Sequence, residues 1–176
     1  DGLAQAGYIY KVQGKGSFVA SKKAGMQLNH LIGFSDEMRS LGLEPSTILM
    51  EQSLMLPTEA VAKALNIDVT QKIYFLTRIR CADGVPMAVE KVHMPFYRFA
   101  GIETQDLSKS LYALLKEQYG CECSKAVQSI QAGAASSHDA KLLKIKTGMP
   151  VLCISRTTYG MDCLLYTSPS PRDYAA

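Results

Sequence analysis

Two arginines, Arg78 and Arg80, stand one residue apart in an apolar segment of the sequence. Side chains alternate across a β-strand, so both arginines lie on one face if this segment is extended. Each guanidinium carries a fork of N–H donors that matches the oxygens of a carboxylate or a phosphate. The spacing therefore predicts an oxyanion clamp. The alternative is a pair of arginines on a solvated sheet face, because buried charges are rare without a partner.

A carboxylate, Glu90, follows in the next apolar segment, beyond an Asp83–Gly84 pair that predicts a β-hairpin. Its position depends on the register of the hairpin. A two-residue turn sets Glu90 opposite Thr77, away from the arginines, whereas a three-residue loop with a bulge sets it opposite Arg80. Because Pro86 has no backbone N–H to donate to the ladder, we expect the longer loop and the Arg80 pairing.

A hydroxyl residue marks the start of a predicted helix between Gly33 and Gly42. We expect Ser35 to be its N-cap and Gly42 its stop, with acidic side chains in the first turn. The exposed amides of a helix N-terminus can bind an anion, and the Ser35 hydroxyl would add a donor. The alternative is that Ser35 is a cap and nothing more.

The strongest helical pattern runs from Asp106 to Gly120, with leucines on one stripe and a glycine stop. We expect Ser108 to be its N-cap. Ser110 and Tyr112 then fall in the first turn, where hydroxyls and free amides can serve an anion together.

The remaining patterns predict an α+β domain with a largely antiparallel sheet. Besides the hairpin and the two helices, they predict strands at 47–56, 121–134 and 151–159 and helices at 58–65 and about 137–144.

Composition limits the class of protein. The 176 residues are 47% hydrophobic, enough for one good core, and the net charge of +3 is too small to mark a nucleic-acid-binding domain. Five cysteines without a Cys-x-x-Cys pair favour a reduced, cytoplasmic setting, and Cys121 and Cys123 read as a strand pair rather than a metal site. We see no membrane span or secretory leader and expect no metal and no cofactor.

Near the start of the sequence, strands Tyr8–Val12 and Ser17–Ala20 flank a glycine-rich turn and predict a small hairpin. This segment resembles the wing of a GntR-type winged helix. The resemblance implies that residues 1–20 are the C-terminal wing fragment of a DNA-binding domain, followed by a linker at 21–32. The implied DNA-contacting residues are Lys11, Gln13, Gly14, Lys15 and Gly16. The alternative is a hairpin left over from truncation.

From residue 33 to residue 160 the sequence resembles the UTRA effector-binding domain of the HutC subfamily of GntR regulators. The residues that carry this likeness are Gly33–Met38 with Gly42, Arg78 and Arg80, Asp83, Gly84 and Pro86, Glu90, Pro95, Ser110–Tyr112, and Arg156–Tyr159. The resemblance implies a chorismate-lyase-like antiparallel sheet flanked by helices, in a homodimeric cytoplasmic repressor whose full-length form binds operator DNA.

Within that subfamily the sequence is most similar to repressors of amino-sugar utilisation. The likeness implies a phosphorylated amino sugar as effector, either glucosamine-6-phosphate or N-acetylglucosamine-6-phosphate. It places Ser35, Arg78, Arg80, Ser110 and Tyr112 around the phosphate and Glu90 near the sugar hydroxyls or amine. Effector binding would control DNA binding allosterically.

The likeness ends after Tyr159. Residues 161–176 differ from the family pattern, and we expect an aberrant or disordered Pro/Ser tail and a missing sheet strand. Two other functions stay open. A chorismate-lyase-like enzyme would need an acid and base in reach, and the three histidines are far apart in sequence. A dimerisation module would act without a ligand. We expect a sensor and no enzyme.

Overall fold

The computed structural model describes residues 9–19, 33–160 and 163–168, within two compact units, residues 1–30 and 31–176. In the first unit, strands β1 (Ile9–Val12) and β2 (Gly16–Val19) pair antiparallel. The expected hairpin is therefore present. The whole of the expected linker, residues 21–32, lies outside the described residues.

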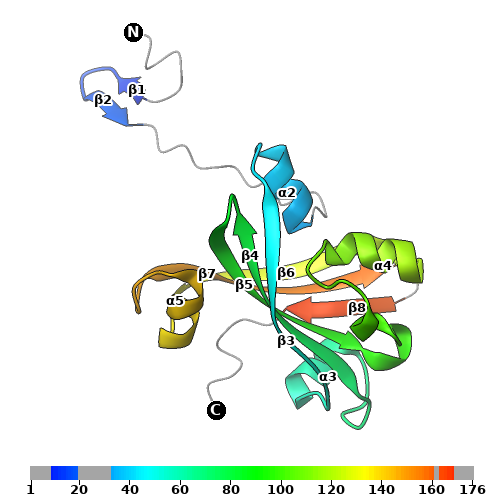
Figure 1. Ribbon diagram of the computed structural model, residues 1–176. Helices are drawn as coiled ribbons and strands as arrows, with labels where there is room; N and C mark the ends of the chain where they lie inside the picture. The colour runs from blue at the N-terminus through cyan, green and yellow to red at the C-terminus, as the bar shows by residue number, and fades with distance from the viewer. Residues whose placement is uncertain (1–8, 20–32, 161–162, 169–176) are drawn as a thin grey trace. The chain divides into compact units, whose positions relative to one another are not determined.

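The second unit contains a six-stranded sheet in the order β3-β4-β5-β8-β7-β6, and every neighbouring pair is antiparallel (Figure 1). The strands are β3 (Pro45–Met55), β4 (Ile73–Ala82), β5 (Val85–Pro95), β6 (Cys123–Ala134), β7 (Pro150–Gly160) and β8 (Cys163–Ser168). In the described part of this unit, helix α2 (Phe34–Ser40) precedes β3. Helices α3 (Glu59–Leu65), α4 (Leu111–Tyr119) and α5 (Ser137–Leu143) lie between strands, with short 3-10 turns at Phe96–Arg98 and Ile102–Thr104. The α+β class and the antiparallel sheet are confirmed.

Strand β8 corrects the expectation of a tail without structure. Its residues, Cys163–Ser168, lie between β5 and β7 and join the two halves of the sheet. The expectation of a missing strand is therefore wrong over this segment. The division into a wing fragment, a linker, an effector domain at 33–160 and a tail otherwise stays a prediction.

The β4–β5 hairpin has a different register from the one expected. Asp83 and Gly84 form a two-residue turn, and both have positive φ, as a type I′ turn requires. A bulge then shifts the register between Arg80 and Cys81, so that Glu90 pairs with Arg78 instead of Arg80. The expected bulge is present, but it follows a two-residue turn instead of a longer loop. Pro86 lies opposite Cys81, between the turn and the bulge.

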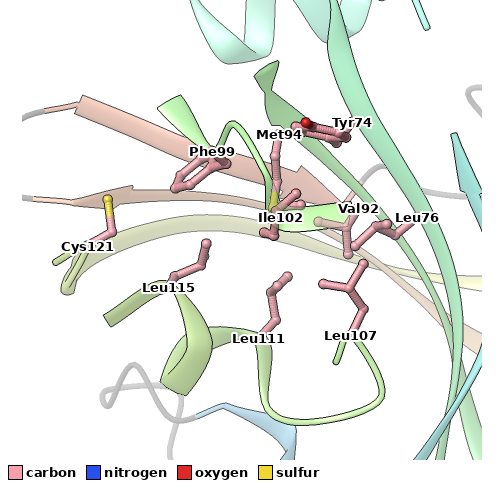
Figure 2. Close-up of a cluster of buried hydrophobic side chains, with 10 residues drawn as sticks. All are labelled: Tyr74, Leu76, Val92, Met94, Phe99, Ile102, Leu107, Leu111, Leu115 and Cys121. Atoms are coloured by element: carbon pink, nitrogen blue, oxygen red, sulfur yellow. The ribbon is translucent and has the colours of Figure 1, made fainter. Parts of the chain in front are cut away.

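The main core lies on the face of the hairpin that also carries the arginines. Figure 2 shows its buried side chains gathered between the sheet and α4. They are Tyr74, Leu76, Val92, Met94, Phe99, Ile102, Leu107, Leu111, Leu115 and Cys121. A smaller cluster packs α3 against Ile73, which alternates to the other face of β4. Among the described residues, none of the helices has the length and apolar character needed to cross a bilayer.

Candidate functional site

The arginine pair continues the row of core side chains along β4. Tyr74 and Leu76 lie in the main core, and Arg78 and Arg80 follow on the same face with only 1% and 4% of their surface exposed. The alternative of a solvated sheet face is therefore wrong. Buried guanidinium groups need anionic or carbonyl partners, so the contacts around each arginine define the site.

Arg78 is paired with Glu90, its neighbour across the hairpin. The Arg78 Nε and Nη2 atoms both donate to Glu90 Oε2, the first over 2.8 Å. The same oxygen lies 3.9 Å from Arg80 Nη1. One carboxylate oxygen thus faces both guanidinium groups, and the Glu90 side chain remains 22% exposed.

The third nitrogen of Arg78 binds the loop before α4. Nη1 donates to the carbonyl oxygens of Leu107 at 3.4 Å and Lys109 at 3.3 Å. These contacts fix the plane of the guanidinium and bring the loop to the arginine pair. Ser110 comes next in the chain and is the N-cap of α4, where its hydroxyl accepts a hydrogen bond from the Ala113 amide.

The expected N-caps are corrected at both helices. Ser110, not Ser108, caps α4, because the Ser108 amide and hydroxyl both donate to Asp106 Oδ1 in a turn before the helix. At α2 the N-cap is Gly33, not Ser35, and no side chain caps the helix. The predicted stop is confirmed, since Gly42 follows α2 with a φ of +77°.

Ser35 instead binds Arg80. The Arg80 Nη2 atom donates to Ser35 Oγ over 2.8 Å, and the Arg80 guanidinium carbon lies 4.8 Å from the centre of the Phe34 ring. Helix α2 therefore covers Arg80 with a hydroxyl acceptor and an aromatic face. Phe34 was not among the predicted site residues, although it stands beside Ser35 in the Gly-Phe-Ser segment.

Tyr112 is linked to β7. Its hydroxyl lies 3.3 Å from Oγ1 of Thr158, a fully buried residue of β7. Its ring packs against Gly33, at the start of α2. Sequence reasoning missed both neighbours. Thr158 stands in a strand whose buried face could not be identified without the β6–β7 register.

Among the predicted residues, Ser35 and Glu90 contact the arginine pair, and Ser110 follows the loop that binds Arg78, whereas Tyr112 contacts Gly33 and Thr158. A cleft of about 560 Å³ opens beside them, between α2, β3 and α4. It is lined by Ser35, Asp36, Arg39, Pro45, Thr47, Gln105, Asp106, Ser108, Lys109, Ser110, Ala113, Leu114, Glu117 and Gln118. Two predicted residues, Ser35 and Ser110, reach this cleft, and Thr47 pairs with Arg80 across the β3–β4 ladder.

The cleft presents charges of both signs. Arg39 binds Asp36 at 3.0 Å, and Lys109 lies 3.5 Å from Asp106. Hydrogen bonds from Ser108 hold the pKa of Asp106 below its usual value, so this carboxylate is charged at neutral pH. The volume suits a small polar molecule. In the described part of the chain, no group of His, Cys, Asp and Glu side chains is arranged to hold a metal ion.

Comparisons with known proteins agree with this architecture. The sequence profile of the UTRA domain matches residues 40–167. The chain is 33% identical over 157 residues to the transcriptional repressor NagR of Bacillus subtilis, covering 89% of this chain and 65% of NagR. It is 28% identical over 161 residues to the Escherichia coli K12 protein named 'Probable fructoselysine utilization operon transcriptional repressor', covering 91% of this chain and 66% of that protein.

A solved structure is similar as well. The effector domain of PhnF from Mycobacterium smegmatis superposes with a TM-score of 0.73 at 25% identity, over 77% of this chain and 85% of that domain. The chain spans slightly less than two thirds of the length of the first of these curated relatives. The match to the UTRA domain at residues 40–167 lies within this shared part.

Proposed function

The chain belongs to the UTRA domain family of GntR-type regulators, and we propose that it is the effector-sensing part of a HutC-subfamily transcriptional repressor. The relatives named above are transcriptional regulators, which supports a regulatory role over a catalytic one. We propose no enzymatic activity.

The effector we propose is a phosphorylated amino sugar, glucosamine-6-phosphate or N-acetylglucosamine-6-phosphate. The observation that carries this proposal is the buried pair Arg78 and Arg80 with a single Glu90 oxygen facing both. Guanidinium forks suit phosphate oxygens, and burial strengthens such contacts by lowering the local dielectric. The fructoselysine operon repressor among the relatives supports a sugar-derived ligand.

In the proposed complex, the phosphate binds near Arg78, Arg80, Ser35, Ser110 and Tyr112. Ser35 and Ser110 line the cleft, whereas the arginines lie beneath α2 and the loop before α4. A phosphate that contacts Arg80 would therefore bind close to its hydrogen bond with Ser35.

Glu90 would then bind the sugar hydroxyls or amine. Its partial exposure leaves its second carboxylate oxygen, Oε1, able to accept from a ligand. The sugar itself would occupy the cleft, where Thr47 and Lys109 add polar groups that sequence reasoning did not identify.

The output we propose is control of DNA binding. Effector binding would favour one arrangement of a homodimer over another and so change its fit to an operator. The wing residues Lys11, Gln13, Gly14, Lys15 and Gly16 would contact DNA phosphates in the full-length cytoplasmic protein.

A calorimetric titration tests the ligand class. The 176-residue chain is titrated with glucosamine-6-phosphate, N-acetylglucosamine-6-phosphate and the two unphosphorylated sugars. We expect saturable binding of a phosphosugar, without turnover, and no binding of the unphosphorylated forms. Equal binding of phosphorylated and unphosphorylated sugars, or release of a product, would contradict the proposal.

A further inference from the structure

Helix α2 is held from two directions. On one side Arg80 donates to Ser35 over 2.8 Å and packs on Phe34. On the other side the ring of Tyr112 packs against Gly33, the residue that begins the helix. Both Arg80 and Tyr112 belong to the effector site proposed above. A ligand bound at that proposed site would lie next to these two contacts of α2.

The contact between Gly33 and Tyr112 is unusually close. A Cβ atom at Gly33 would lie 2.8 Å from Cδ2 of the Tyr112 ring, a distance that forces either the ring or the backbone to move. The Gly33 backbone has φ −70° and ψ 154°, which any residue adopts. Glycine is thus needed here for the approach of the ring and not for the backbone conformation.

Gly33 also carries the first turn of the helix. Its carbonyl oxygen accepts hydrogen bonds from the amides of Asp36 at 3.1 Å and Glu37 at 3.0 Å. A shift of the backbone at Gly33 therefore disturbs α2 directly. Along the chain, Gly33 follows the segment that leads from the β1–β2 hairpin.

The far end of the Tyr112 side chain is fixed by the sheet. Its hydroxyl lies 3.3 Å from Oγ1 of Thr158, which is fully buried in β7. The tyrosine therefore spans from the sheet to the start of α2.

We propose that Thr158 and Gly33 are positioning residues that make Tyr112 a latch, tying occupancy of the effector site to α2. This inference rests on the proposed function for its ligand. The latch itself is a mechanical link among Thr158, Tyr112 and Gly33, and it is testable without any ligand. An effector that breaks the contact between the Tyr112 hydroxyl and Thr158, or the hydrogen bond from Arg80 to Ser35, removes a contact that stabilises α2.

The first test is hydrogen–deuterium exchange of amides 37–43 in the full 176-residue chain without sugar. Thr158→Val removes the hydroxyl and keeps the shape. We expect it to raise exchange in this segment about threefold or more, as expected when a typical hydrogen bond is lost. Thr157→Val is the matched control, because Thr157 alternates to the other face of β7. Unchanged exchange in Thr158→Val, or equal effects of both variants, overturns the latch.

The second test adds glucosamine-6-phosphate and measures binding and exchange on the same samples. We expect the ligand to change exchange of residues 37–43 in the wild type, and Gly33→Ala to bind within about tenfold while losing that change. A Gly33→Ala variant that binds and responds like the wild type overturns the latch. Absence of calorimetric binding to the wild type contradicts the proposed function instead, and the Thr158→Val comparison then decides the latch alone.

Discussion

Glu90 accepts two hydrogen bonds from Arg78 on a single carboxylate oxygen, and the two residues face each other directly across the β4–β5 hairpin. The pair explains how a guanidinium is kept in an almost fully buried position. It also places one carboxylate within reach of both arginines.

Removing the charge of Glu90 leaves that guanidinium without its anionic partner. We expect Glu90→Gln to lower the free energy of unfolding by about 2 kcal/mol, less than for a fully buried pair because Glu90 is partly exposed. Urea denaturation measures this change. Glu51→Gln, the same substitution at an exposed position of β3, serves as control and should change stability little. Equal stability of the two variants would show that the pair does not hold Arg78.

The bulge in β5 sets which residue faces Arg78. Met87, an exposed residue, is the extra residue of this bulge. Deleting it would remove the bulge and make the strand pairing continuous from the Asp83–Gly84 turn, while Glu90 still faces Arg78. We expect this deletion to stay within about 1 kcal/mol of the wild type in unfolding free energy.

Inserting an alanine after Ala88 has the opposite effect. It moves Glu90 opposite Thr77, on the other face of the sheet. This variant should lose several times more stability in the same urea denaturation. If the deletion proves the more damaging of the two, the assigned register is wrong.

Ser110 caps α4 through its hydroxyl, so Ser110→Ala should cost about 1 kcal/mol of unfolding free energy. Ser108→Ala is the control, because Ser108 binds an exposed turn before the helix. Thermal unfolding of the two variants should separate them by several degrees. A larger loss of unfolding free energy in Ser108→Ala than in Ser110→Ala would indicate that Ser108, and not Ser110, caps α4.

Tyr74 predicts a loss of stability at alkaline pH. Burial, and a hydrogen bond from its hydroxyl to Glu103, raise the pKa of Tyr74 from 10.0 to about 12. Between pH 10 and about 12 the native protein therefore keeps a Tyr74 proton that the unfolded chain releases. The contribution of Tyr74 to the free energy of unfolding is fully present below pH 10 and is lost as the pH rises through about 12.

Tyr74→Phe removes this contribution, and its unfolding free energy should fall less steeply between pH 10 and 12 than that of the wild type. Cys123, whose pKa burial raises to about 12, changes stability in the same direction and is present in both proteins. Equilibrium urea denaturation at a series of pH values measures the slopes. Parallel slopes would contradict the raised pKa of Tyr74.

The sequence correctly predicted the features that depend only on residues close together in the chain. The Asp83–Gly84 pair predicted the hairpin, and strand alternation placed Arg78 and Arg80 on one face. Predictions failed where distant contacts decide the outcome. Ser35 has the side chain of an N-cap, but in the fold it is turned toward Arg80, a residue 45 positions away.

The register and the last strand depended on information that a single segment does not carry. The bulge in β5 follows a two-residue turn, a combination that neither of the two alternatives contained, so Glu90 pairs with Arg78. Strand β8 is only six residues long, and it is placed by pairing with both β5 and β7, which are distant in sequence or joined to it by a turn. Thr158 could be recognised only after β7 was placed in the sheet.

The central claim is that the buried arginine pair recognises a phosphate. The most direct test is calorimetric titration of glucosamine-6-phosphate into the wild type, Arg78→Ala and Arg78→Lys, with Arg156→Ala as a control on β7 and circular dichroism to confirm folding. We predict that Arg78→Ala weakens binding by about 2 to 4 kcal/mol, Arg78→Lys by less, and Arg156→Ala hardly at all. A folded Arg78→Ala that binds the phosphosugar as tightly as the wild type would contradict the account.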